Sequence, residues 1–141
     1  MLLERFYKSV TDHFPEKDNV HIIDVRGLSF KRYLEIAKLT GNKVAVITDN
    51  DANYQTNCIA RYSEYSDDTN INVFYHTNND QKTFENVLYA DNTALCDTLF
   101  GTGAENYMLN NKTEAAFALL SQDQLITVPD YIMRAINWIK K

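Results

Sequence analysis

The sequence predicts an α/β fold built on a parallel sheet with flanking helices and a helical C-terminal part. Three short apolar runs, at 20–25, 43–48 and 71–76, are typical of strands because β-branched residues are frequent in them and turn-forming or polar residues follow. Helical patterns separate the runs, and an order of strand, helix, strand, helix, strand is typical of a parallel sheet. Such sheets bind ligands at the carboxyl ends of their strands.

Helical spacing of apolar residues predicts the first helix over Leu2 to Phe14, and Pro15 and the polar residues after it end that helix. Arg26-Gly27 predicts a tight turn, and Ser29 is placed to cap a helix over Phe30 to Leu39. A weaker helical stretch follows the second strand, at about 54–62. The remaining expected helices lie at 83–89, 93–99, 104–109, 112–120 and 129–141. The side chains expected in the core around the second helix are Phe30, Leu34, Ala37 and Val46.

Length and composition indicate one domain over 1–141, with a core over about 1–90 and a helical extension over about 91–141. The apolar stretches are far shorter than the roughly 20 residues of a membrane helix, so we expect a cytoplasmic protein without a membrane partner. A net charge of −5 argues mildly against nucleic-acid binding by this chain in isolation, because phosphate contacts favour basic proteins. Cys58 and Cys96 are expected to be buried thiols.

The sharpest local feature is Asp49-Asn50-Asp51, directly after the second predicted strand. Alternate side chains of an extended backbone point the same way, so Asp49 and Asp51 are expected to converge. Two converging carboxylates suit Mg²⁺ or Mn²⁺, which prefer oxygen ligands. The alternative is a simple turn, because Asp and Asn are common turn formers.

The stretch VRGLSFKRYLEIAKLTGNKVAVITDNDAN resembles the core of the C-terminal TOPRIM domain of OLD-family (overcoming lysogenization defect) ATP-dependent endonucleases. The Gly-x-Ser-Phe-Lys segment narrows the resemblance to this family, because TOPRIM domains in general share Asp-x-Asp but not this segment. Two later segments extend it. Glu85, in KTFENVL, resembles the family's Glu that joins the metal site, and Lys112, in NKTEAAFA, resembles the Lys placed near the scissile phosphate. Their alternatives are a first-turn Glu favoured by the helix dipole and an ordinary surface Lys.

The resemblance implies a metal-dependent DNA endonuclease that hydrolyses phosphodiesters with two Mg²⁺ or Mn²⁺ ions. Asp49, Asp51 and Glu85 would hold metal, and these three with Lys112 would be the catalytic residues. The implied partners are DNA and an upstream ABC-type ATPase domain, in the same or a separate chain, with homo-oligomerisation through the ATPase part left open. The sequence has no Gly-x-x-x-x-Gly-Lys-Ser/Thr motif, so this chain is not expected to hydrolyse ATP by itself.

One departure from the family pattern concerns the N-terminus. TOPRIM domains open with a strand that ends in Glu-Gly, whereas Met1 here precedes the first helix directly. We therefore expect a domain truncated at its N-terminus that lacks the first catalytic Glu and is impaired as an isolated chain. Glu4 lies inside the helix, outside the motif position.

Two other functions remain open from the sequence. The first is a catalytically inactive TOPRIM remnant that serves as an interaction domain, which the absent Glu favours. The second is a phosphatase of the haloacid dehalogenase type, which also places Asp-x-Asp after an apolar strand and uses its first Asp as nucleophile. That class usually has Thr or Val two residues after the second Asp, where this sequence has Asn53.

Overall fold

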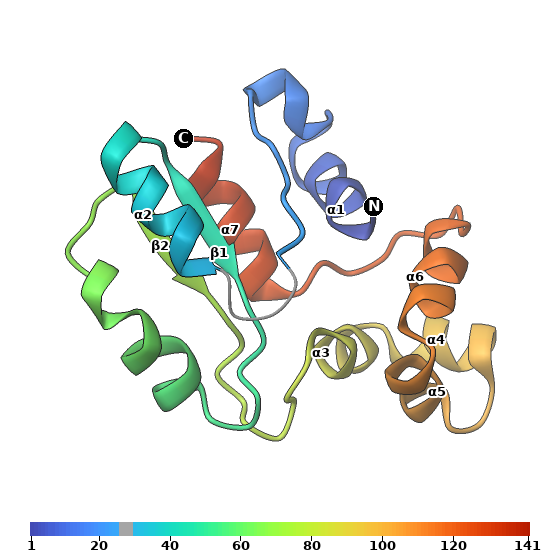
Figure 1. The fold of residues 1–141 in the computed structure, drawn as a ribbon. Coiled ribbons are helices and arrows are strands. Elements are labelled where there is room, and N and C mark those ends of the chain that lie inside the picture. Colours follow the sequence, from blue (N-terminus) through green and yellow to red (C-terminus); the bar gives the residue numbers. More distant parts are fainter. Residues whose placement is uncertain (26–29) are drawn as a thin grey trace.

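The structure, a computed structural model, describes residues 1–25 and 30–141. Within these residues the sheet has two parallel strands, β1 (Val44–Ile47) and β2 (Ile71–Phe74). Val44 is paired with Ile71, and Ile47 with Phe74. Helices lie against both sides of this small sheet (Figure 1). The predicted α/β class, with a parallel sheet and flanking helices, is therefore confirmed.

The helices follow the predicted segments to within a few residues. The α-helices are α1 (Leu2–Thr11), α2 (Phe30–Thr40), α3 (Phe84–Asp91), α4 (Thr93–Phe100), α5 (Ala104–Asn110), α6 (Lys112–Leu120) and α7 (Asp130–Ile139). The weak helical stretch after β1 is a π-helix, Gln55–Ile59, followed by a 3₁₀-helix, Ala60–Tyr65. A further 3₁₀-turn covers Pro15–Asp18. The predicted Arg26-Gly27 turn and Ser29 cap lie outside the described residues.

The sheet separates two apolar clusters. Val46 and Ile71 pack with Leu34 and Ala37 of α2 and with two buried tyrosines of the 3₁₀-helix. Phe74 packs on the other side, in a larger cluster that includes residues of α1 and of α3 to α7. Alternate side chains of a strand face opposite sides of the sheet, which explains why each short strand serves both clusters. Of the residues expected in the core, Leu34, Ala37 and Val46 are buried, while Phe30 is only partly buried.

Replacement of Leu34 by Ala is expected to destabilise the domain by about 2–5 kcal/mol, because Leu34 is 0% exposed and its loss leaves a cavity between α2 and β1. Thermal unfolding followed by circular dichroism measures the change. Leu39→Ala is the matched control, since Leu39 lies on the same helix and is 87% exposed. Equal melting temperatures for the two variants would contradict this packing of α2.

The predicted strand at 20–25 does not form. The Val20 N–H donates to the Pro15 carbonyl, a bond that belongs to the preceding turn, and residues 20–25 have no regular secondary structure. Val20 packs partly against the larger cluster, while Ile23 is 59% exposed. An apolar, β-branched run becomes a strand only when a neighbouring strand bonds to its backbone. Within the described residues β1 pairs with β2 alone, so the segment has no ladder to join.

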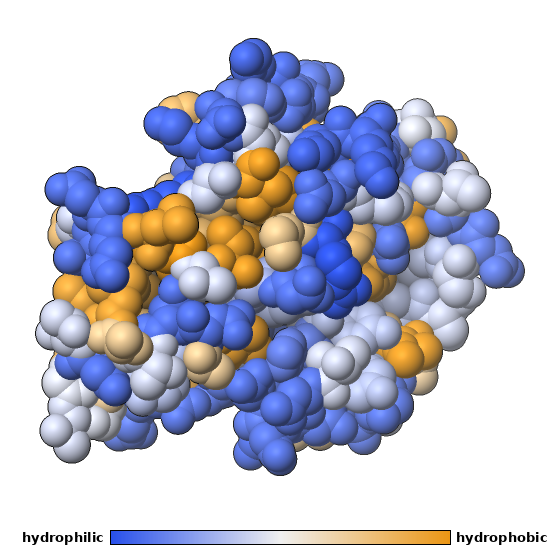
Figure 2. Space-filling view, turned by 180° about the vertical axis from the view of Figure 1, so that it is seen from behind, coloured by the Kyte–Doolittle hydropathy of each residue, from blue (hydrophilic) through white to orange (hydrophobic). Residues whose placement is uncertain are grey.

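The face seen from behind is mostly hydrophilic (Figure 2). Apolar side chains gather in the centre and on the left of that view, which corresponds to the right of Figure 1, where α4 to α6 lie. Phe117 of α6 is 72% exposed, and Leu125, in the segment after α6, is 80% exposed. Cys58 and Cys96 are buried free thiols, as predicted. The described helices include none with the length and apolar character needed to cross a membrane.

Candidate active site

The candidate site lies where the chain leaves the carboxyl ends of β1 and β2, and hydrogen bonds join the two loops that begin there. The side-chain amide of Asn50 donates to the carbonyl oxygens of His76 at 2.9 Å, Asn78 at 2.9 Å and Gln81 at 3.2 Å. The Asp51 N–H donates to the Lys82 carbonyl at 3.1 Å. The loop after β2 is therefore held against the Asp49-Asn50-Asp51 segment, and it leads into α3.

Asp49 faces the N-terminus of α3. Its Oδ1 accepts a hydrogen bond of 2.7 Å from the N–H of Phe84, the first residue of that helix. A carboxylate is favoured there, because the first N–H groups of a helix have no partner within it and carry partial positive charge. Asp49 therefore contacts the residue that directly precedes Glu85 in α3. The structure thus brings together two predicted site residues that are 36 positions apart in the sequence.

Glu85 and Lys112 form an ion pair. Lys112 Nζ, at the first residue of α6, donates to Glu85 Oε2 at 2.9 Å. The Glu85 side chain is 13% exposed and the Lys112 side chain 54% exposed, so Lys112 approaches from the solvent side. The Glu85 side chain, in the first turn of α3, is therefore mostly covered, and its role as a metal ligand stays a prediction.

Burial and neighbouring charges affect the ionisation of Asp49. Burial raises the pKa of Asp49, the hydrogen bond from Phe84 opposes that rise, and the negative charge of Glu85 adds to it. Lys112 lowers the Asp49 pKa and Asp51 raises it, by smaller amounts. Like charges this close favour a proton or a cation that neutralises them. The cluster is thus electrostatically suited to a positive ion.

The backbone after Asn50 turns sharply, which the sequence did not predict. Asp51 and Ala52 both have left-handed backbone, with φ of 48° and 67°, and the Asn53 N–H closes the turn on the Asn50 carbonyl at 2.9 Å. The Asn50 side-chain oxygen accepts from the Ala52 N–H. We expected Asp49 and Asp51 to point the same way because we assumed an extended backbone. The backbone is not extended at Asp51, so this reason for their convergence does not apply. Asp51 is exposed, and its role as a ligand stays a prediction.

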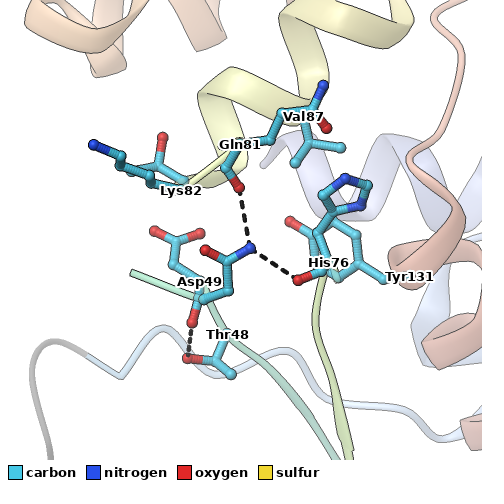
Figure 3. A pocket seen from close by; sticks show the side chains of 9 residues that line it. Thr48, Asp49, His76, Gln81, Lys82, Val87 and Tyr131 are labelled. Atoms are coloured by element: carbon cyan, nitrogen blue, oxygen red, sulfur yellow. Dashed lines mark hydrogen bonds between the residues drawn. The ribbon is translucent and has the colours of Figure 1, made fainter. Parts of the chain in front are cut away.

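A narrow pocket behind Asp49 includes two residues that the sequence did not single out. His76 ends the predicted third strand and Tyr131 belongs to α7. Their ring centroids lie 6.2 Å apart, and Figure 3 shows the two residues next to each other, on the opposite side of the view from Asp49. Burial raises the Tyr131 pKa, and Asp49 adds to the rise, so its hydroxyl stays protonated. The last helix, which matched nothing functional in the sequence, therefore forms one wall of the site.

Asp49→Asn is expected to raise the thermal stability of the protein at neutral pH. The pKa of Asp49 is higher in the folded than in the unfolded chain, so the folded state binds more protons just above the unfolded pKa of about 3.9. Stability from this group is present at low pH and is lost as the pH rises through the folded pKa. Melting curves from pH 3 to 8 should show the advantage of the variant growing with pH. A variant less stable than wild type at pH 7 would contradict the shift.

Comparison with known proteins finds a family match in the N-terminal part of the chain. Residues 1–51 match the family model described as "Overcoming lysogenization defect protein-like, TOPRIM domain". This match, which is consistent with a TOPRIM domain of OLD-family proteins, confirms the predicted resemblance over α1, α2, β1 and the turn that follows. It includes Asp49 and ends at Asp51, so Glu85 and Lys112 lie beyond it. No curated protein and no solved structure matches the chain significantly.

The side chains of the site fit a divalent cation in part. The Asp49 and Glu85 carboxylates are hard oxygen donors of the kind that Mg²⁺ and Mn²⁺ prefer. Among residues 1–25 and 30–141, however, no three His, Cys, Asp or Glu side chains form a group that could hold a metal ion. A cation would have to share Glu85 with Lys112, its present partner. The donors thus suit the ion in chemistry but are few in number.

Proposed function

We propose that the chain is the nuclease part of an OLD-family endonuclease, and that Asp49 and Glu85 hold a divalent cation, Mg²⁺ or Mn²⁺, for the hydrolysis of DNA phosphodiesters. The observation that carries the proposal is the meeting of Asp49, Glu85 and Lys112 beside the carboxyl end of β1. The family match over residues 1–51 supports the same function, because nuclease-type activity is what that class suggests. Asp51, exposed on the adjoining turn, is the third proposed ligand.

Each side chain has a separate task in this proposal. Asp49 is held in one orientation by the Phe84 N–H, which leaves its second oxygen for a cation. Glu85 supplies a further oxygen when its ion pair with Lys112 opens. The bound cation would supply Lewis-acid chemistry, activating water and stabilising the leaving oxygen. Lys112, half exposed at the start of α6, would then contact the phosphate and offset its growing negative charge.

DNA as partner is part of the proposal, although the chain is acidic. The net charge of −5 gives little general attraction for phosphates, so binding would depend on the cation, on Lys112 and on a basic surface supplied from elsewhere. An upstream ABC-type ATPase, in the same or another chain, is the proposed source, and self-association through that part is proposed with it.

Titration calorimetry with Mn²⁺ tests the metal site. Wild type is expected to bind weakly, well below the affinity of a full carboxylate cage, because few donors are gathered. Asp49→Ala should remove the heat of binding, and Glu85→Ala should reduce it. Asp97→Ala is a matched control, since Asp97 lies on α4 and pairs with Tyr89 instead. Equal heats from wild type and Asp49→Ala would remove the site from consideration.

An interaction domain without catalytic activity is the second candidate, and one observation favours it. Asp49 already has a structural task at the start of α3, and Glu85 is already neutralised by Lys112. A remnant of this kind would keep both contacts and would show residual metal binding without cleavage of DNA. Mn²⁺-dependent nicking of supercoiled DNA, with and without the upstream part, separates the two functions.

A further inference from the structure

Asn50 is the most deeply buried polar side chain near the site. It is 1% exposed and uses its amide completely: the nitrogen donates to three carbonyl oxygens of the loop after β2, and the oxygen accepts from the Ala52 N–H. Its own carbonyl accepts from the Asn53 N–H and from the Asn57 side chain. One side chain thus connects the loop that carries Asp49 with the loop that leads to Glu85.

The turn that Asn50 begins is strained, which shows that its surroundings determine its shape. Left-handed backbone is unfavourable for a residue with a Cβ, and here Asp51 and Ala52 both adopt it. Such conformations persist where neighbouring contacts over-determine them, often beside functional groups. The contacts here are those of Asn50, together with the Asp51 N–H on the Lys82 carbonyl.

We propose that Asn50 is a positioning residue of the candidate site: its buried amide sets the separation of the Asp49 and Glu85 carboxylates by joining the end of β1 to the loop before α3. The inference rests on the proposed function, because it concerns the cation that those two carboxylates hold. Asn50 touches no cation itself. It acts through the loop geometry, since α3 can present Glu85 to Asp49 only while the loop before it is held in place.

A second buried asparagine provides a control of the same kind. Asn92, 8% exposed, donates to the Leu88 and Thr127 carbonyls and accepts from the Thr127 N–H. It connects the end of α3 to the segment before α7 and makes no hydrogen bond to the loops after β1 and β2 among those of the described residues. Replacing either asparagine removes a buried amide that joins two segments, so both replacements destabilise the fold. Only the replacement of Asn50 alters the proposed site.

The experiment compares Mn²⁺ affinity in Asn50→Ala, Asn50→Asp and Asn92→Ala, each titrated below its measured melting temperature. Asn50→Ala is expected to weaken Mn²⁺ binding about 10–100-fold, the usual loss when a group supporting metal ligands is removed. Asn92→Ala should melt earlier and bind Mn²⁺ as wild type does. Asn50→Asp keeps the acceptor for Ala52 and adds negative charge beside Asp49. If only the added charge mattered, Asn50→Asp would bind Mn²⁺ more tightly than wild type. If the Asn50 hydrogen bonds position Asp49 and Glu85, their loss makes this variant bind Mn²⁺ more weakly.

Weaker binding by Asn50→Asp, with unchanged binding by Asn92→Ala, supports the inference even if Asn50→Ala does not fold. Wild-type affinity in folded Asn50→Ala, or tighter binding by Asn50→Asp, overturns it and leaves the proposed function standing. Equal weakening by Asn92→Ala also overturns it, since the effect would then follow general stability. Failure of wild type to bind Mn²⁺ overturns the proposed function and this role together.

Discussion

A segment that supplies one strand and a Glu-Gly turn, joined ahead of Met1, is expected to give Mn²⁺-dependent nicking of supercoiled DNA. The 141-residue chain by itself is expected to give no detectable nicking in Mg²⁺. Two features of the described residues motivate this prediction: no group of three acidic or metal-binding side chains forms, and β1 bonds to one strand only. An added Glu near Asp49 would supply a third carboxylate, and it could accept a proton from the attacking water.

The expected gain is large because loss of a general base typically lowers a rate by about 10²–10⁴-fold. The matched control carries Gln-Gly in place of Glu-Gly, which keeps the added strand and removes the carboxylate. Nicking is measured by conversion of supercoiled to open-circular plasmid on a gel. Strong cleavage by the 141-residue chain, lost in Asp51→Ala, would contradict the prediction. Another acid, with Asp24 the first to test, would then take the place of the added Glu.

Lys112→Ala is expected to change metal binding and cleavage in opposite directions. Lys112 pairs with Glu85 at 2.9 Å, so a cation must displace it to use that carboxylate. An exposed ion pair is worth at most ~1 kcal/mol, which corresponds to about a fivefold change in affinity. Removing Lys112 should therefore tighten Mn²⁺ binding by up to that factor. Cleavage by the protein with the added strand should fall by about 10²–10³-fold, because a charge that stabilises the transition state is lost.

Calorimetry and plasmid nicking on the same preparations measure the two effects. Lys82→Ala is the control, because Lys82 lies in the loop beside the site and its backbone carbonyl, which accepts from the Asp51 N–H, is retained in the variant. If Lys112→Ala binds Mn²⁺ as wild type does and cleaves at the same rate, Lys112 is an ordinary surface residue.

The helices could be predicted well because their signals are local. Each helix is indicated by the spacing of its own apolar residues, and its ends are indicated by neighbouring residues such as Pro15 and the polar segments between helices. The prediction of a strand at 20–25 was wrong because strand formation is not determined locally. Its composition is that of a strand, but a strand also needs a neighbour, and pairing depends on distant parts of the chain. The ends of β1 and β2 differ from prediction by one or two residues, a normal uncertainty of boundaries.

The site could be predicted in part. The resemblance pointed to Asp49, Glu85 and Lys112, and the structure brings these three together through α3 and α6. The left-handed turn at Asp51 could not be foreseen, because neither Asp51 nor Ala52 is a Gly. The turn depends on a hydrogen bond that the Asn57 side chain donates and on one that the Lys82 carbonyl accepts. Tyr131 was missed since it enters from α7, 82 positions after Asp49, with no local motif around it. Asn50 was not singled out from the sequence, although its buried side chain makes four hydrogen bonds.

The most direct test of the account is a crystal structure of the protein soaked in Mn²⁺, with the ion located by its anomalous scattering. The account predicts a peak between the Asp49 and Glu85 carboxylates, with Lys112 moved away from Glu85 and the Asn50 hydrogen bonds unchanged. A well-ordered site that still shows the Glu85–Lys112 ion pair and no Mn²⁺ at Asp49 would contradict it.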